Sequence, residues 1–167
     1  MQTHDIYMRM ALRQADQAMS EGEVPTGCVI IDTAPDRPPD RSPLLAQAHN
    51  QVERLQDPTA HAEMIAITQA ANARGDWRLT NTILYVTKEP CAMCAGAIVL
   101  ARIPTVVYGA PDPLRGGALS RFRILDTPEL NHRCEVLHGV LGTECAAVLK
   151  TFFQNCRARN GGTNRAD

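Results

Sequence analysis

The sequence of 167 residues lacks the features that mark several classes of protein. No segment approaches the roughly 18 consecutive apolar residues that a membrane helix needs. The first residues contain neither a basic nor an apolar stretch, so no secretory signal is predicted. Basic and acidic side chains number 17 and 18 and give a formal net charge of −1, which excludes a histone-like nucleic-acid binder. We therefore expect a cytoplasmic protein, in which charge placement could still create a local basic face.

Six cysteines are present, but without an export signal they are poor candidates for a disulfide framework. In a reducing compartment, clustered cysteines more often bind a metal or take part in chemistry. Cys91 and Cys94 form a Cys-x-x-Cys pair directly after Pro90. The other four are predicted to be small buried residues: Cys28, Cys134, Cys145 and Cys156.

Apolar periodicity predicts helices that alternate with short apolar strands. The predicted helices cover 5–22, 58–74, 91–101 and about 143–157, and the predicted strands cover 27–31, 44–50, 82–87, 105–108 and 135–141. Four prolines mark 33–43 as an exposed loop. This alternation is typical of an α/β sandwich around one mixed sheet. The length fits a single domain, which we place at 1–157, followed by a flexible tail over 158–167.

The residues suited to chemistry are concentrated in His61-Ala62-Glu63 and Pro90-Cys91-Ala92-Met93-Cys94. Cys91 and Cys94 are three apart, so on a helix they share a face and can hold one ion. Unpaired backbone N–H groups and the helix dipole favour thiolates in the first turn of a helix. His61 is predicted to lie in a first turn as well, after Pro58. Thiolates and imidazole are ligands that zinc prefers, and three of them leave its fourth position to water.

Each motif has other interpretations when it stands alone. A Cys-x-x-Cys pair is also found as a redox pair or as half of a structural zinc site, and His-x-Glu is common by chance. A structural site needs a fourth Cys or His, for which His49 is the nearest candidate. Glu63 lies roughly 200° around a helix from His61, so it is not expected to be a ligand on the same face. If zinc lies off the helix end, Glu63 reaches the metal-bound water as a general base; the alternative is a surface glutamate.

The two motifs together resemble the zinc-dependent deaminase superfamily. More narrowly, the chain resembles the bacterial tRNA adenosine deaminases, which convert the wobble adenosine of an anticodon to inosine. The similarity runs from about Tyr7 to Phe153. Besides the metal motifs it includes Gly22-Glu23-Val24-Pro25, His49-Asn50, Asn131-His132-Arg133, Gly139-Val140-Leu141 and Phe152-Phe153. It implies a three-layer α/β/α cytidine-deaminase-like fold with a central mixed sheet of about five strands.

The resemblance also implies a mechanism and a metal. His61, Cys91 and Cys94 would bind one Zn²⁺ per subunit, and zinc would make a water reactive at neutral pH. Glu63 would be the catalytic residue that transfers protons while C6 of adenine is attacked and ammonia leaves. The family further implies a homodimer with the tRNA anticodon stem-loop as its partner.

For substrate binding, the resemblance implies that Asn50 contacts the flipped nucleotide. Val24, Pro25 and the backbone of Ala62 would line its pocket, and Asp112 would contact the RNA backbone. From the residues alone, Asn50 is also compatible with a turn at a strand end, and Asp112 with an Asp-Pro turn.

Several segments depart from the family pattern beside the RNA. Many relatives have arginine or lysine at the positions of Pro111, Pro113 and Leu114. Residues 154–157 are less basic than usual, and the 33–43 loop is longer.

Other side chains suit RNA, each with a second interpretation. Arg115, Arg121 and Arg123 suit phosphate, although 15 of the 17 cations are arginine, so composition explains them equally well. Phe152 and Phe153 would stack on bases or pack in a core.

Two other functions are compatible with these residues. The metal motifs act on the ring and not on what is attached to it, so a free nucleobase or nucleotide of the guanine, cytosine or dCMP type is an alternative substrate. A zinc-stabilised binding module without activity is the third hypothesis. Glu63 and the incomplete set of protein ligands favour an enzyme over that module.

Overall fold

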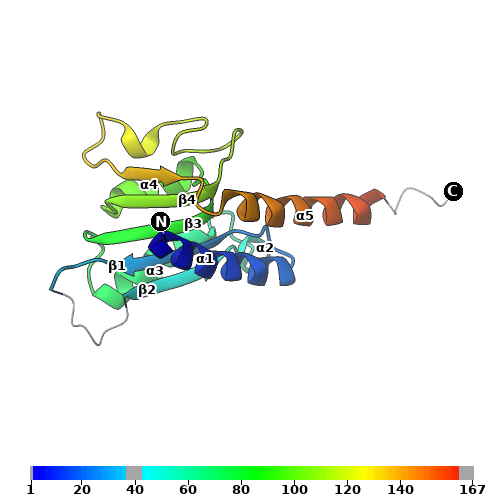
Figure 1. Ribbon diagram of the computed structural model, residues 1–167, viewed down its shortest axis with the longest axis horizontal. Helices are drawn as coiled ribbons and strands as arrows, with labels where there is room; N and C mark the ends of the chain where they lie inside the picture. Colours follow the sequence, from blue (N-terminus) through cyan, green and yellow to red (C-terminus); the bar gives the residue numbers. More distant parts are fainter. Residues whose placement is uncertain (1, 37–42, 162–167) are drawn as a thin grey trace.

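The computed structural model describes residues 2–36 and 43–161, within which five strands form one mixed sheet. The strands are β1 (Gly27–Asp32), β2 (Leu44–His49), β3 (Thr82–Lys88), β4 (Thr105–Ala110) and β5 (Glu135–His138). The helices are α1 (Gln2–Ser20), α2 (Val52–Leu55), α3 (Ala62–Arg74), α4 (Ala92–Leu100), α5 (Gly142–Gly161) and the short 3-10 helix η1 (Ile124–Asp126). The expected α/β fold around a mixed sheet of about five strands is confirmed (Figure 1).

The sheet has the strand order β2-β1-β3-β4-β5. β1 runs antiparallel to both β2 and β3, whereas β3, β4 and β5 are parallel. Successive side chains of a strand point to opposite faces, so β1 contributes Cys28 and Ile30 to one core and Val29 and Ile31 to the other. Because both faces are covered, the central strands read as continuous apolar runs rather than as alternating patterns.

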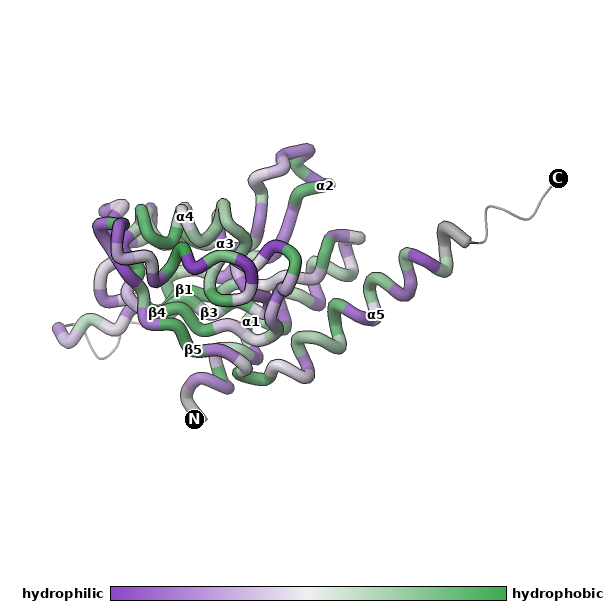
Figure 2. The backbone as a smooth tube through the Cα atoms, turned by 90° about the horizontal axis from the view of Figure 1, so that it is seen from above, coloured by the Kyte–Doolittle hydropathy of each residue, from purple (hydrophilic) through white to green (hydrophobic). Residues whose placement is uncertain are grey.

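Helices cover both faces of the sheet (Figure 2). α3 and α4 pack on the Cys28 face, where the buried residues of α3 are three alanines and Glu63. α1 and α5 pack on the other face through residues that include Met8 and Cys145, and the C-terminal half of α5 extends away from the sheet (Figure 1). Among the described residues, no helix combines the length and the apolar character needed to span a bilayer.

The prediction that a helix begins at Pro58 was wrong, because α3 begins four residues later. The carboxylate of Asp57, expected to cap the helix, instead accepts hydrogen bonds from the backbone N (2.8 Å) and Oγ1 (2.7 Å) of Thr59. The backbone N of Ala60 bonds to the carbonyl of Asp57 at 3.1 Å, so residues 57–60 close as a turn. This is the short-range bonding by which Asp favours turns over helix interiors. The one-turn helix α2 before it was not predicted.

Two boundaries near the C-terminus also differ from the prediction. The last strand ends at His138 and not at residue 141, because Gly139 and Leu141 adopt positive φ angles of 80° and 48°. Helix α5 continues to Gly161, beyond the expected end near residue 157. The division into a domain (1–157) and a tail (158–167) stays a prediction. Residues 37–42 of the expected loop and 162–167 of the expected tail lie outside the described residues.

Candidate active site

The segments that carry the predicted site residues meet at one edge of the sheet, the one formed by the ends of its strands. β3 ends there at Lys88, and because β1 is antiparallel to β3, β1 begins there. The backbone N of Gly27 donates to Oγ1 of Thr87 at 3.1 Å, and His49 at the end of β2 pairs with Gly27. Helices α3 and α4 also begin at this edge, with His61 and Cys91 as the residues that immediately precede them. Segments that are far apart in the sequence therefore meet at one place.

His61, Cys91 and Cys94 form a compact group of metal-ligating atoms. Nδ1 of His61 lies 3.6 Å from Sγ of Cys91 and 3.5 Å from Sγ of Cys94. At ordinary zinc distances of about 2.3 Å for sulfur and about 2.0–2.1 Å for nitrogen, tetrahedral ligands of these two kinds lie about 3.6 Å apart. The donor set and its spacing therefore fit a zinc ion held by three protein ligands.

The protonation of the cluster is consistent with a cation site. The hydrogen bond with Cys94 lowers the pKa of Cys91 to about 3, although burial opposes the shift. The same hydrogen bond and burial raise the pKa of Cys94, and the hydrogen bond with Cys91 raises the pKa of His61. These shifts favour a thiolate at Cys91. A divalent cation would stabilise a second one at Cys94, because metals bind the deprotonated form of cysteine.

Glu63, the second residue of α3, lies beside this cluster and is 3% exposed. The interpretation as a surface glutamate is therefore wrong. Burial raises the pKa of its carboxyl group above the usual value for glutamate. A carboxyl group whose pKa is shifted toward neutrality can take up and release a proton during a reaction.

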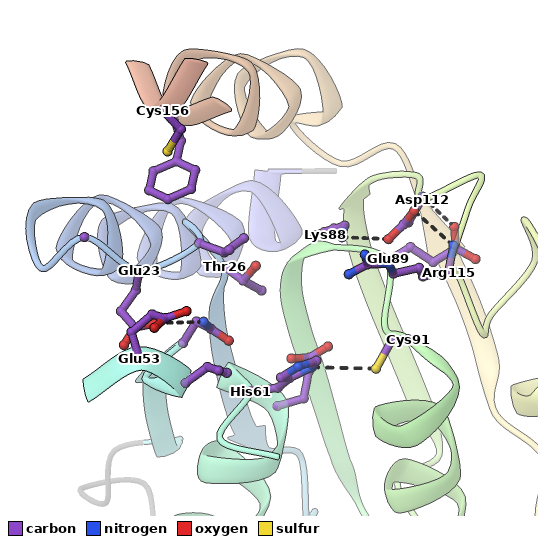
Figure 3. A pocket seen from close by; sticks show the side chains of 16 residues that line it. Glu23, Thr26, Glu53, His61, Lys88, Glu89, Cys91, Asp112, Arg115 and Cys156 are labelled. Carbon is purple, nitrogen blue, oxygen red and sulfur yellow. Dashed lines mark hydrogen bonds and ion pairs between the residues drawn. The ribbon is translucent and has the colours of Figure 1, made fainter. Parts of the chain in front are cut away.

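A cavity of about 640 Å³ includes His61, Glu63 and Cys91 in its wall (Figure 3). Its other lining residues come from the segment before β1, the segment after β2, the end of β3, the loop after β4 and helix α5. The volume is within the range of about 300–1,000 Å³ that is common for small-molecule sites.

The structure brings together only some of the residues predicted to bind substrate. Val24, Asn50 and Asp112 line the cavity. Pro25 and Ala62 are buried and do not contribute to its lining. Their roles, and those of the three lining residues, stay predictions.

Glu23 is a buried residue of the cavity wall to which the sequence analysis assigned no role. Its Oε2 accepts a hydrogen bond from Nδ2 of Asn50 at 3.1 Å, and its Oε1 accepts one from the backbone N of Arg54 at 2.8 Å. Its exposure is 1%. The first of these bonds fixes the amide group of Asn50, and the second ties Glu23 to helix α2. The place of Glu23 in the Gly22-Glu23-Val24-Pro25 block was the available signal.

Glu89 is the second buried carboxylate that the sequence reasoning missed, and it joins the start of α4 to the loop after β4. It is 2% exposed and accepts backbone hydrogen bonds from Asp112 (2.9 Å), Ala118 (3.2 Å), Leu119 (2.8 Å) and Ser120 (2.8 Å). The hydroxyl of Ser120 donates to it as well. Burial raises the pKa of Glu89, but these hydrogen bonds outweigh that effect and lower it.

Asp112 is engaged within the chain, by Lys88 at the end of β3. Oδ2 of Asp112 lies 2.6 Å from Nζ of Lys88. Its Oδ1 accepts hydrogen bonds from the backbone N of Leu114 and of Arg115, both at 3.1 Å. Burial raises the pKa of Asp112, but the Lys88 cation and these hydrogen bonds lower it overall.

His49, which was considered as a fourth ligand, and the four cysteines that were predicted to be buried are not part of the metal-ligating group. Both ring nitrogens of His49 have other partners, with Nδ1 3.4 Å from Oε1 of Gln14 and Nε2 3.1 Å from Oε2 of Glu21. All six cysteines are unpaired in the described part of the chain. Three of the four predicted to be buried are so, namely Cys28, Cys134 and Cys145. The fourth, Cys156 on α5, is only half-buried and lines the cavity.

The side chains considered for RNA binding separate into two groups. Arg115 and Phe152 line the cavity. Arg121 and Arg123 do not, and Arg123 forms an ion pair with Asp126 at 2.9 Å. Phe153 is 45% exposed and meets the Phe152 ring edge-on, so the interpretation of Phe153 as a core residue was wrong.

Comparisons with known proteins agree with this geometry. Residues 1–110 match the model of the cytidine and deoxycytidylate deaminase zinc-binding region. A tRNA-specific adenosine deaminase of Haemophilus influenzae is 45% identical over 150 residues, which cover 90% of this chain and 83% of the relative. One of Bacillus subtilis is 42% identical over 155 residues, which cover 93% and 91%.

A solved structure from a study of A-to-I editing by tRNA:A34 deaminases at the wobble position of transfer RNA is also similar. It superposes with a TM-score of 0.76 at 39% identity, over 85% of this chain and 97% of that one. The chain therefore belongs to the cytidine and deoxycytidylate deaminase zinc-binding family, within its group of tRNA-specific adenosine deaminases.

Proposed function

We propose that this chain catalyses the hydrolytic deamination of adenosine to inosine at the wobble position of tRNA anticodon loops, in the cytoplasm. The observation that carries this proposal is the His61, Cys91 and Cys94 cluster beside buried Glu63, in a cavity of about 640 Å³. The similarity to tRNA-specific adenosine deaminases supports the choice of substrate. A loop nucleotide suits a deaminase, because extruding it from the stack costs less than extruding a paired base.

The three ligands would hold zinc, which when bound makes water reactive at neutral pH by lowering its pKa. Glu63 takes a proton from the water that attacks C6 and delivers it to the ring nitrogen N1 of adenine. It then takes the remaining proton of the attacking oxygen and delivers it to the amino group, which leaves as ammonia as the C6 carbonyl of inosine forms. Burial supports this role, because it raises the pKa of Glu63 and allows the same side chain to accept and donate.

The cavity wall would position the extruded nucleotide. Asn50, held by Glu23, presents its amide oxygen to a donor of the nucleotide. Val24 supplies an apolar surface in the lining, whereas Pro25 and Ala62 are buried and would act on the nucleotide only through the residues that line the cavity. Asp112 lies at the opposite wall, where the RNA backbone would pass (Figure 3).

We also propose that the chain works as a homodimer. Leu100 of α4 is 69% exposed and Leu130 is 41% exposed. Both line an apolar hollow together with Ala92, Gly96 and Val99. Burying such side chains in a symmetric contact would remove apolar area from water. Light scattering of the purified protein tests this, and a monomer at working concentration would contradict it.

The decisive experiment measures metal content and inosine formation on a synthetic anticodon stem-loop with adenosine at the wobble position. Wild type is compared with Glu63→Gln, which keeps the size of the side chain but cannot accept a proton. We expect about one zinc per chain in both and a loss of at least about 10²-fold in rate for the variant. Inosine is quantified by mass spectrometry after nuclease digestion.

The same experiment separates the alternatives. Zinc-loaded wild type that leaves the stem-loop unchanged would contradict the proposal. Deamination of free guanine, cytosine or dCMP under those conditions would then identify a nucleobase or nucleotide deaminase. Equal activity in wild type and Glu63→Gln would contradict the role of Glu63, and no activity on any substrate would favour a binding module.

A further inference from the structure

The charged side chains of the cavity are divided between two walls (Figure 3). Glu23 and Glu53 lie on one wall, near β1 and α2. Lys88 and Arg115 lie on the other, around Asp112. Asp112 and Glu89 place two carboxylates on the same wall, so its charges balance. Glu89 is 2% exposed and both of its oxygens accept hydrogen bonds from residues 112–120, so Lys88 and Arg115 are the more exposed charged groups of this wall.

Lys88 is fixed in this wall by its ion pair. Nζ of Lys88 lies 2.6 Å from Oδ2 of Asp112, and the side chains are 29% and 10% exposed. Asp112 is itself held in place, because its backbone N donates to buried Glu89 at 2.9 Å. A lysine ammonium has three donors. The contact with Asp112 uses one of them, and a side chain that is partly exposed in the cavity wall can direct another toward a ligand.

Arg115 is brought to the same wall through the same carboxylate. Its backbone N donates to Oδ1 of Asp112 at 3.1 Å, and its side chain is exposed in the cavity lining. Among the described residues that line the cavity, no lysine or arginine is present besides Lys88 and Arg115. An anionic group entering beside the metal cluster therefore meets the side chains of Lys88 and Arg115 on one side, whereas Glu53 lies on the other.

We propose that Lys88 and Arg115 form a subsite for a phosphodiester that flanks the target nucleotide, and that Asp112 is a positioning residue that holds Lys88. The proposal rests on the proposed function, because only a polynucleotide presents such a phosphodiester. Asp112 then acts on the RNA backbone through Lys88, because an anionic carboxylate by itself repels a phosphate. A neutral nucleobase gains nothing from this subsite.

The test compares wild type with Lys88→Met, which removes the charge and keeps an unbranched side chain. With the zinc-loaded enzyme and the wobble-adenosine stem-loop, we expect KM to rise about fivefold at 0.1 M salt while kcat stays within about twofold. The slope of log KM against log salt concentration should fall by about 0.7–1. A fall in kcat with unchanged KM and salt slope would overturn the subsite.

Arg78→Met is the matched control, since it removes one positive charge at the opposite edge of the sheet. Arg78 is exposed and precedes the N-terminal end of β3, whereas Lys88 lies at its C-terminal end, about 20 Å away along the strand. We expect this variant to keep the KM and the salt slope of wild type. If it changes both as much as Lys88→Met does, the effect is one of net charge and the subsite is overturned.

A chemical change in the RNA tests the contact itself. Stem-loops are made with a neutral methylphosphonate in place of the phosphodiester on the 5′ or the 3′ side of the wobble adenosine. For one of the two linkages, the methylphosphonate should weaken binding to wild type about as much as Lys88→Met does, with no further loss when the two changes are combined. If, at both linkages, the methylphosphonate and Lys88→Met weaken binding independently, so that their factors multiply when they are combined, the proposal is overturned.

Asp112→Asn tests the positioning role in both backgrounds. We expect it to raise KM when Lys88 is present and to add less than about twofold in the Lys88→Met protein, because residues in one network are not additive. An equal rise in both backgrounds would overturn this role. Failure of the proposed function gives a different result, because zinc-loaded wild type would then neither bind nor deaminate the stem-loop at any salt concentration.

Discussion

Replacing Glu89 with glutamine removes one of the two carboxylate oxygens that hold residues 112–120 against the start of α4. In the folded protein, Oε1 accepts the backbone N–H groups of Ala118, Leu119 and Ser120. Oε2 accepts the backbone N–H of Asp112 at 2.9 Å and the hydroxyl of Ser120. A glutamine can keep the first set by placing its oxygen there. Its amide NH₂ then faces the N–H of Asp112, donor against donor, while the Ser120 hydroxyl can rotate to accept.

The magnitude follows from that one buried N–H. Leaving a buried donor unsatisfied costs about 1–3 kcal/mol, so we expect Glu89→Gln to lower the free energy of unfolding by about 2 kcal/mol. For a chain of this size, about 1 kcal/mol corresponds to about 2–4 °C in Tm, which predicts a decrease of about 4–8 °C. The loop that carries Asp112 and Arg115 is loosened at the same time, so KM for the stem-loop should rise more than kcat falls.

The assay is thermal unfolding followed by circular dichroism at pH 7 with a fixed excess of zinc. Glu135→Gln is the matched control, because Glu135 is exposed on the edge strand β5 and surface substitutions usually stay within about 0.5 kcal/mol. A decrease in Tm below about 1 °C for Glu89→Gln, or equal decreases for both variants, would refute the role of Glu89 as the anchor of this loop.

Three further predictions follow from neighbouring features. Folding lowers the pKa of Glu89, so the stability advantage of wild type over Glu89→Gln should be complete above pH about 4.5. The advantage should shrink as the pH falls through the pKa of Glu89 in the folded protein. Unfolding scans from pH 7 to pH 3 that show a constant difference would contradict this. A methyl group at Gly116 would lie 2.5 Å from both carboxylate oxygens of Glu89, whereas one at Gly96 in α4 would meet nothing within 4 Å. Gly116→Ala should therefore destabilise by about 1–3 kcal/mol in denaturant titrations. Gly96→Ala should be neutral or stabilise by up to about 1 kcal/mol at protein concentrations where the chain is monomeric, and the reverse order would be inconsistent with this packing. Metal analysis of Cys94→Ser should find well below one zinc per chain. The control Cys134→Ser should keep its zinc, because the thiol of Cys134 instead donates to the carbonyl of Ile103 at 3.1 Å. Full zinc occupancy in Cys94→Ser would rule out Cys94 as a ligand.

The fold class followed from local patterns in the sequence. Short apolar runs of four to six residues predicted the strands at 27–31, 82–87 and 105–108, and each lies within a strand of the sheet. The start of α3 was predicted incorrectly, because Asp57 and Pro58 are as suitable for a tight turn as for a helix cap. Choosing between these depends on where His61 must lie to reach the cysteines, which is a long-range constraint.

The metal cluster and the nearby glutamate were also determined by the sequence, since zinc chemistry restricts both the residue types and their spacing. Cys91 and Cys94 are three residues apart, so their proximity is a local property of a helix start. Their contact with His61, 30 residues earlier, was inferred from chemistry and resemblance rather than from local geometry.

Only the tertiary structure revealed Glu23, Lys88 and Glu89 as parts of the site. Their partners come from other segments, with Glu89 bonded to residues 112–120 and Glu23 to Asn50 and Arg54. A single carboxylate or ammonium in a sequence has no periodicity that indicates its partner. The pairing arises because β3 ends where β1 begins and where the loop after β4 folds back, and that arrangement is set by strand order and register across the whole sheet.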